Sequence, residues 1–138
     1  MLASNSRTMT EFDLRRLNAL FQRFREQVRP PATLTALERE VAQAVAVKPE
    51  DIPATVVTMN SEVEVIDLIT EERRSITVVF PSLAAIEQGR VSVLAPLGTA
   101  LIGNREGAHV AWHTPRGPRQ LRVERVLFQP EAAGRFDL

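Results

Sequence analysis

Residues 10–31 read TEFDLRRLNALFQRFREQVRPP, and this stretch decides how the N-terminal part of the chain folds. Its large apolar side chains recur at spacings of three, four, three and four residues. They are Leu14, Leu17, Phe21, Phe24 and Val28. This a/d heptad seam, with mostly polar and charged residues between its members, predicts an amphipathic helix. Thr10 is expected to cap the helix, with Asp13 three residues on as an imperfect capping box.

Two prolines end this first helix, because Pro30 and Pro31 lack the amide donor and keep the residue before them out of helical geometry. A second helix is expected from residues 33–35 onward, where Thr35 and Glu38 form an S/T-x-x-E capping box. Its apolar seam is expected to reach Lys48 through Leu34, Leu37, Val41 and Val45. Two amphipathic helices joined by a tight turn predict an antiparallel pair, a short helical hairpin or coiled coil over residues 1–48.

The pattern of the chain changes at residues 48–53, KPEDIP, which we interpret as a linker. Beyond it, β-branched residues alternate with other side chains. Val63 and Val65 mark one expected strand, and Ile76 and Val78 mark the next. This period of two predicts half-buried strands.

The rest of the chain predicts a turn, a short helix and two more strands. Gly89 marks the turn, and residues 96–103 have the proline-first, glycine-last pattern of a short helix. Strands are expected over residues 108–113, with Trp112 pointing inward, and then to about residue 128. Hairpin-linked strands with one helix predict an α+β fold with a mostly antiparallel sheet, so residues 52–138 are expected to form a second domain.

Composition excludes several classes of protein. With 138 residues, 44% of them hydrophobic, the chain suits one ordinary domain or two very small ones. No apolar run approaches the ~20 residues of a membrane span, and residues 1–10 lack the apolar stretch of a signal peptide, so a cytoplasmic location is expected. The absence of cysteine excludes disulfides and cysteine zinc sites. Seventeen basic and seventeen acidic residues balance, which makes duplex nucleic acid a poor candidate partner and protein a better one.

Two glycines have the spacing of a phosphate-binding loop. Gly98 and Gly103 are five residues apart, but Asn104 and Arg105 stand where such a loop has its lysine and its Ser/Thr. The expected helix also precedes the second glycine, whereas in a phosphate loop it follows that glycine. We therefore interpret Gly103 as a helix cap, and no cofactor is predicted.

The two histidines do not form a metal site. His109 and His113 are four residues apart on an expected strand, a span of about 13 Å, so they cannot both bind one ion directly. We interpret them as surface residues, and no metal ligand is predicted.

Acidic pairs offer no catalytic site either. Glu62 and Glu64 occupy the polar half of a period-two pattern, which is typical of a solvated sheet face rather than of an acid/base pair. No nucleophile stands in a recognisable catalytic motif. The chain is therefore expected not to be an enzyme, and no catalytic residue is predicted.

The densest basic run lies in the last expected strand, at Arg116, Arg119, Arg122 and Arg125. In a regular strand, Arg119 and Arg125 face one way and Arg122 the other. We favour a charged edge strand that resists aggregation. The alternative is a contact for an acidic protein surface or for nucleic acid.

Three segments beyond the linker carry a family resemblance: VVTMNS at residues 56–61, SVLAPLGTALIG at 92–103 and QPEAAG at 129–134. In this order they resemble the Rnk family, the regulators of nucleoside diphosphate kinase. The middle segment, with Gly107 downstream, also resembles the C-terminal domain of the GreA/GreB transcript cleavage factors.

The resemblance implies an FKBP-like β domain and a coiled coil that can enter the secondary channel of bacterial RNA polymerase. Gre factors carry acidic residues at the coiled-coil tip that help hold a catalytic magnesium ion. Residues 27–34 of this chain, QVRPPATL, contain no carboxylate, so those catalytic residues do not carry over. The implied function is a regulator that competes with Gre factors without stimulating cleavage. The expected partner-contacting residues are Glu26, Gln27, Arg29, Pro30, Pro31 and Thr33.

Other functions are weighed against this one. A general interaction protein that acts on nucleotide metabolism or signalling through other partners is the main alternative. An FKBP-like enzyme is disfavoured, because a fold does not bring its activity along and Trp112 is interpreted as a core residue. DNA or RNA contact is expected only through the polymerase, and neither a membrane nor a small-molecule substrate is expected.

Overall fold

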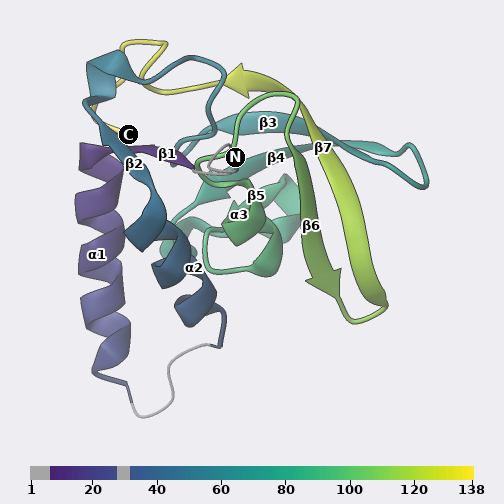
Figure 1. Ribbon diagram of the computed structural model, residues 1–138, viewed down its shortest axis with the longest axis horizontal. Helices are drawn as coiled ribbons and strands as arrows, with labels where there is room; N and C mark the ends of the chain where they lie inside the picture. The colour runs from purple at the N-terminus through teal and green to yellow at the C-terminus, as the bar shows by residue number, and fades with distance from the viewer. Residues whose placement is uncertain (1–6, 28–31) are drawn as a thin grey trace.

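The computed structural model describes residues 7–27 and 32–138, which form two helices beside a five-stranded sheet (Figure 1). In chain order the main elements are β1 (Thr8–Thr10), α1 (Glu11–Arg25), α2 (Ala32–Gln43), β2 (Val45–Val47), β3 (Glu62–Asp67), β4 (Arg73–Val79), β5 (Arg90–Ser92), α3 (Pro96–Leu101), β6 (His109–Thr114) and β7 (Gly117–Phe128). Short 3-10 helices lie at Pro49–Asp51, Pro81–Leu83 and Ile86–Gln88. Over these described ranges, no helix combines the length and hydrophobicity that a membrane crossing requires.

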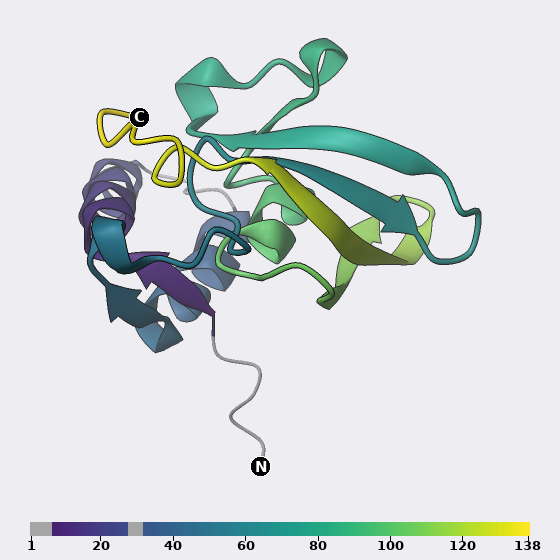
Figure 2. The ribbon, with the colours of Figure 1, turned by 90° about the horizontal axis from the view of Figure 1, so that it is seen from above.

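The main sheet has the strand order β5-β4-β3-β7-β6. Its neighbouring strands are antiparallel, except that β4 and β5 run parallel. The expected mixed α+β architecture with a mostly antiparallel sheet is therefore confirmed. The sheet curls around α3, and the pair of helices α1 and α2 stands at one side of it (Figure 2).

The first helix begins as the sequence predicts. The Thr10 hydroxyl accepts a hydrogen bond from the backbone N–H of Asp13 at 2.9 Å, which satisfies one of the unpaired donors of the first turn. Leu17 and Phe21 are fully buried, whereas Phe24 is half-buried. Val28, the last residue of the predicted seam, lies outside the described residues.

The second helix is shorter than the seam predicts, so the assignment of Val45 to it is wrong. α2 ends at Gln43, and Val45–Val47 form β2, which pairs in parallel with Thr8–Thr10 of β1. The N–H of Val45 donates to the carbonyl of Arg7 at 2.7 Å, and the Val45 side chain is 51% exposed. Two β-branched valines in three residues favour an extended strand once a partner strand is beside them. That partner is more than thirty residues away, and so local periodicity could not reveal it.

The expected strands of the main sheet are confirmed. Val63 and Val65 of β3 and Ile76 and Val78 of β4 are buried, while Glu62 and Glu64 are partly exposed. Over these residues the alternation separates a buried face from a polar one, as period-two patterning requires. Ile66 and Val79 lie in the opposite phase and are also buried.

The arginine run does not lie on an edge strand, so the favoured interpretation is wrong. β7 lies between β3 and β6 in the sheet. The expectation that Arg119 and Arg125 share one face of the sheet is also wrong, because a β-bulge shifts the register between Glu64 and Val65. Arg125 therefore pairs with Glu64 on the polar face at 3.6 Å, while Arg119 pairs with Asp67, which alternates onto the opposite face.

The helices and the sheet share one core. Leu17, Phe21 and Leu37 of the helices belong to the same cluster of buried side chains as Met59 and Leu101. The N-terminal helices are therefore packed onto the β part rather than held away from it. The turn after β7 crosses to the N-terminal end of α1, as both ribbon views show (Figures 1 and 2).

The short helix α3 begins and ends at the residues that the sequence predicts. Pro96 stands in its first turn, Ile102 is the C-cap, and Gly103 follows with a φ of 79°. This left-handed conformation is the usual one for a glycine that terminates a helix, so the cap interpretation is confirmed. Gly98 has a packing role instead, because a Cβ there would meet the carbonyl oxygen of Ser92 at 2.1 Å.

Candidate functional site

The predicted contact residues lie where α1 ends and α2 begins. Glu26 caps the C-terminus of α1, and Gln27 donates its N–H to the carbonyl of Phe24 at 3.1 Å. Both side chains are exposed, and Thr33 at the start of α2 is half-buried. Arg29, Pro30 and Pro31 lie outside the described residues. The structure therefore brings the described members of this set to one end of the helix pair.

One ion pair joins the two helices near this end. Nη2 of Arg25 lies 2.5 Å from Oε2 of Glu38, and Nε of Arg25 lies 3.2 Å from the same oxygen. Because the pair is solvent-exposed, it stabilises the helix pair by at most ~1 kcal/mol. The pair matters more for metal binding than for stability, since the carboxylate of Glu38 is already engaged by the guanidinium of Arg25. Over residues 7–27 and 32–138, no three or more His, Asp or Glu side chains gather in a metal-binding group.

At the other end of α1, a buried carboxylate anchors the helix to the β part. Oδ2 of Asp13 accepts a hydrogen bond from the backbone N–H of Met59 at 3.0 Å, and Oδ1 accepts from Nη2 of Arg16 at 2.5 Å. Asp13 is 1% exposed. Burial raises the pKa of Asp13, because the charged form loses water, while these two donors act in the opposite direction. A buried, hydrogen-bonded anchor of this kind fixes how α1 is oriented on the sheet.

The guanidinium of Arg16 extends the anchor to the C-terminal turn. It stacks on the rings of Phe12 and Phe80, 4.0 and 5.0 Å from their centroids, and donates to the carbonyl of Leu138 at 3.0 Å. Glu131 of the same turn accepts from the Thr58 hydroxyl at 2.7 Å, and burial raises the pKa of Glu131. The segment after β7 thus joins α1 to the loop before β3. Sequence patterning marked neither the hydrogen bond from Arg16 to Leu138 nor the one from Thr58 to Glu131, because each joins residues distant along the chain.

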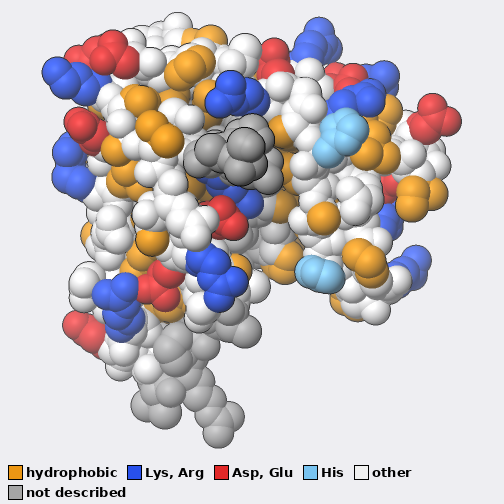
Figure 3. All heavy atoms as spheres, viewed as in Figure 1, with side chains coloured by type: hydrophobic (Ala, Val, Ile, Leu, Met, Phe, Trp, Pro, Cys, Tyr) orange, Lys and Arg blue, Asp and Glu red, His pale blue; other side chains and the backbone are white. Residues whose placement is uncertain are grey.

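The remaining sequence candidates have structural roles or lie at the surface. Both histidines are exposed on β6, and Figure 3 shows both pale-blue side chains at the surface, apart from one another. The side-chain amide of Asn104 donates to the carbonyl of Ala100 at 2.6 Å, so it closes the turn after α3. Glu64 pairs with Arg73 and Arg125 on the polar sheet face.

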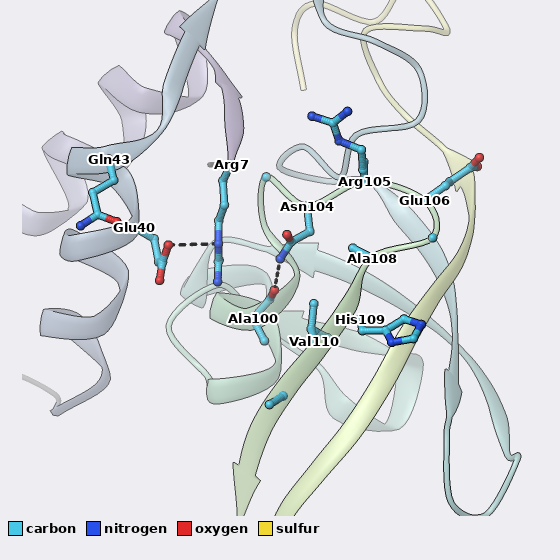
Figure 4. Close-up of a pocket in the computed structure, with 13 residues that line it drawn as sticks. Arg7, Glu40, Gln43, Ala100, Asn104, Arg105, Glu106, Ala108, His109 and Val110 are labelled. Atoms are coloured by element: carbon cyan, nitrogen blue, oxygen red, sulfur yellow. Dashed lines mark hydrogen bonds and ion pairs between the residues drawn. The ribbon is translucent and has the colours of Figure 1, made fainter. Parts of the chain in front are cut away.

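A cavity of about 800 Å³ lies between α2 and β6, and sequence reasoning missed it. Figure 4 shows Glu40 and Gln43 of α2 on one side, His109 and Val110 of β6 on the other, and Arg7 between them. Nε of Arg7 lies 3.1 Å from Glu40, and its Nη1 donates to the carbonyls of Thr99 and Ile102. Burial lowers the pKa of Arg7, and the charge of Glu40 opposes that change. Arg7 precedes the first apolar seam, so no pattern singled it out.

Comparison with known proteins gives a consistent result. The family model described as transcription elongation factor GreA/GreB, C-terminal part, matches residues 52–128. The chain is 40% identical over 102 residues to the regulator of nucleoside diphosphate kinase of Escherichia coli strain K12. The matched region covers 73% of this chain and 75% of that protein. It is 34% identical over 100 residues to the transcription inhibitor protein Gfh1 of Thermus aquaticus, and this match covers 71% of this chain and 62% of that protein.

Among solved structures, the chain is similar to the prokaryotic transcription elongation factor GreA/GreB from Nitrosomonas europaea. The two have a TM-score of 0.75 and 32% sequence identity, and the match covers 88% of this chain and 99% of that one. The likeness thus extends beyond the β part and includes most of the helical part.

Proposed function

Because the chain belongs to the GreA/GreB family of transcription elongation factors and is Rnk-like, we propose that it is a transcription regulator that binds bacterial RNA polymerase without stimulating transcript cleavage. One observation carries this proposal. Residues 52–128 match the GreA/GreB C-terminal family model, whereas residues 27–34, between the first two helices, contain no carboxylate.

The proposal includes a finer architecture. The curled sheet with α3 is an FKBP-like domain over residues 52–138, and α1 and α2 are a helical hairpin within residues 1–48. The hairpin end enters the secondary channel of the polymerase. The buried anchor of Asp13 and Arg16 supports this role, because it stabilises one orientation of α1 relative to the sheet.

The chemistry of the helix-pair end argues against cleavage. Magnesium-assisted hydrolysis needs oxygen ligands that hold the ion and orient a water molecule. Of the two nearest carboxylates, Glu38 is paired with Arg25, and Glu26 stands on α1 without a second acidic residue beside it in sequence. Arg29 adds a positive charge in the connecting segment, and a positive charge repels a metal ion.

Inhibition then follows from occupancy. A protein that covers the Gre binding site without supplying the metal ligands lowers cleavage in proportion to its occupancy, and an excess of Gre factor reverses the effect. The name of the Thermus aquaticus relative, a transcription inhibitor protein, supports this direction.

The test is a cleavage assay on purified, backtracked polymerase complexes with the full chain. We expect no cleavage above the intrinsic rate of the polymerase, and inhibition of added Gre factor that rises with concentration. Arg29→Glu should weaken inhibition, whereas Arg15→Glu, an equal charge reversal at an exposed position near the other end of α1, should not. Cleavage by the chain itself that disappears in Glu26→Ala would refute the proposal, as would equal effects of the two arginine variants.

A second candidate function rests on the name of the Escherichia coli relative, a regulator of nucleoside diphosphate kinase. In that case the chain is an interaction module that acts on nucleotide metabolism or signalling through other partners. A pull-down from bacterial lysate distinguishes the two functions, because recovery of polymerase subunits favours the first and recovery of a kinase without polymerase favours the second.

A further inference from the structure

β6 is a free edge of the main sheet. It pairs with β7 on one side, and the sheet order places no described strand on its other side. In an antiparallel pair, only every second residue exchanges hydrogen bonds with the partner strand. The N–H of Val123 donates to the carbonyl of Ala108 at 2.9 Å, so the bonded positions on this strand are the even-numbered ones, Val110 and Trp112 among them.

The odd-numbered residues of β6 therefore direct their backbone groups away from β7. These residues are His109, Ala111 and His113, and none of their N–H or C=O groups bonds to a described residue outside the β6–β7 ladder. Pro118, which stands opposite His113, has no N–H to donate. This agrees with the assignment, because a non-bonded pair requires no donor from Pro118. The free edge of β6 thus offers alternating donors and acceptors on three residues.

The strand itself lacks the residue types that normally prevent strand pairing. Residues 109–114, HVAWHT, contain no Lys, Arg, Asp, Glu or Pro. Natural sheets place such residues, or a bulge or a covering element, on exposed edges to avoid joining other chains. The opposite edge strand, β5, has only three residues and is bridged by Ala85 at Arg90. The open edge of β6 is therefore longer and less protected than that of β5.

A groove runs along the free edge of β6. Two cavities, of about 800 and 350 Å³, form it and share Arg7, Ala100 and Ala111 among their lining residues. The wall opposite β6 is one stripe of α2, formed by Thr33, Ala36, Glu40 and Gln43. We call this space the β6–α2 groove; Figure 4 shows its larger part.

We propose that the β6–α2 groove binds one extended peptide segment of a partner protein, which adds to the free edge of β6 as a further strand. Neighbouring strands lie about 4.8 Å apart, so the added strand occupies the groove between β6 and α2. This proposal goes beyond the proposed function and does not depend on it, since it concerns a different face from the end of the helix pair.

The shape of the groove favours a single strand over a second copy of the chain. Two β6 edges could pair only if two whole sheets approached each other edge to edge. Here α2 stands across the groove from β6 and obstructs the approach of a second sheet, while one extended chain needs no such access.

The lining of the groove indicates the chemistry of the peptide. Its smaller cavity is largely apolar and is formed partly by Ala36, Pro96, Ala100 and Trp112. In an extended peptide, every second side chain points to the same face. The groove therefore suits a peptide with apolar side chains at alternate positions. In the larger cavity, Arg7 is paired with Glu40, and Arg105 and Glu106 carry opposite charges, so no strong charge preference is expected.

The test uses the full chain and the peptide acetyl-Lys-Thr-Val-Thr-Val-Thr-Val-Thr-Lys-amide. Trp112 is the single tryptophan and lines the groove, so its fluorescence reports occupancy. We expect a saturable change in emission. One copy of the peptide is N-methylated at all valines and another at all threonines. Only one residue type can direct its N–H groups to β6, so one copy should bind at least about tenfold more weakly than the other.

Two variants of the chain form a matched pair. Ala36→Glu places a charge in the apolar part of the groove, and Ala42→Glu places the same charge on α2 outside the stripe. Both alanines are exposed, and each new glutamate has Arg39 three residues away and another glutamate four residues away. We expect Ala36→Glu to weaken peptide binding about tenfold or more and Ala42→Glu to leave it unchanged.

Several results would overturn the proposal. They are the absence of a saturable change up to ~5 mM peptide, equal binding of the two N-methylated peptides, and equal binding by the two glutamate variants. A chain that sediments as a dimer and becomes monomeric on Ala111→Pro would assign the edge to a second copy instead.

Discussion

The two phenylalanines of α1 should differ sharply in how much they stabilise the protein. Phe21 is 1% exposed and belongs to the core shared by the helices and the sheet, whereas Phe24 is half-buried at the margin of that core. Truncating a fully buried phenylalanine to alanine costs about 3–5 kcal/mol, because the transfer free energy and a cavity term add. We therefore expect Phe21→Ala to lower the free energy of unfolding by about 3–5 kcal/mol.

Phe24→Ala should cost less for two reasons. Part of the Phe24 ring stays in water in the folded chain, so its transfer free energy falls below the 1.5–3 kcal/mol of a fully buried side chain, to roughly 1–2 kcal/mol. The space that the ring leaves is open to solvent and adds little cavity energy. Alanine is also about 0.5 kcal/mol better than phenylalanine in a helix, a gain common to both variants. The sequence alone placed both residues on the seam and could not rank them.

Equilibrium urea unfolding of the full chain measures this difference. With a slope of ~2 kcal/mol/M, the unfolding midpoint should fall by roughly 1.5–2.5 M in Phe21→Ala and by ~0.5 M in Phe24→Ala. Far-UV circular dichroism reports the helices, and the fluorescence of Trp112 reports the β part. Because Phe21 shares its core with Met59 and Leu101, both signals should shift in Phe21→Ala. An equal or larger cost for Phe24→Ala, or an unmoved fluorescence midpoint in Phe21→Ala, would refute this account of the core.

Three further outcomes can be measured on the same protein. The pKa of Asp67 is lowered to about 2 by the N–H groups of Thr70 and Ile69 and by Arg119, so Asp67 stabilises the fold above its unfolded pKa. That stability should be lost as the pH falls from about 4 to 2, and Asp67→Asn should show a shallower loss in acid denaturation. Gly98→Ala should destabilise the chain by about 1–3 kcal/mol, since its methyl group meets a backbone oxygen; an unchanged melting temperature would contradict that packing. A fragment of residues 52–138 should keep its sheet with reduced stability, and complete loss of its β signal in circular dichroism would count against the two-domain division.

Where the signal is local, sequence reasoning reached several individual residues, although Thr35, expected to cap the second helix, lies inside α2, which begins at Ala32. Thr10 caps α1 and Gly103 closes α3, because a cap depends on the residues within one turn of it. The buried face of β3 and β4 follows from a period of two, at Val63, Val65, Ile76 and Val78. The expected contact set was placed in part, with Glu26 and Gln27 exposed at the end of α1.

Where the structure depends on residues far apart in the chain, sequence reasoning failed. Val45 has an apolar side chain at helical spacing and leaves the helix only because the Arg7 segment lies beside it. Arg125 changes face because a bulge forms against β3. Asp13 is interpreted locally as part of a capping box, but its carboxylate binds the backbone of Met59, forty-six residues away.

The sequence by itself thus determined the helices, most strands of the main sheet, the buried valines and isoleucine of β3 and β4, and the family, since these depend on residue order over short windows or on motifs. Only the tertiary structure decided which strand is the edge, that the helices share a core with the sheet, and that α2 stands opposite β6 across a groove. These features depend on which distant segments pack together. That choice comes from burial of apolar surface and completion of hydrogen bonds over the whole chain, and no local window contains it.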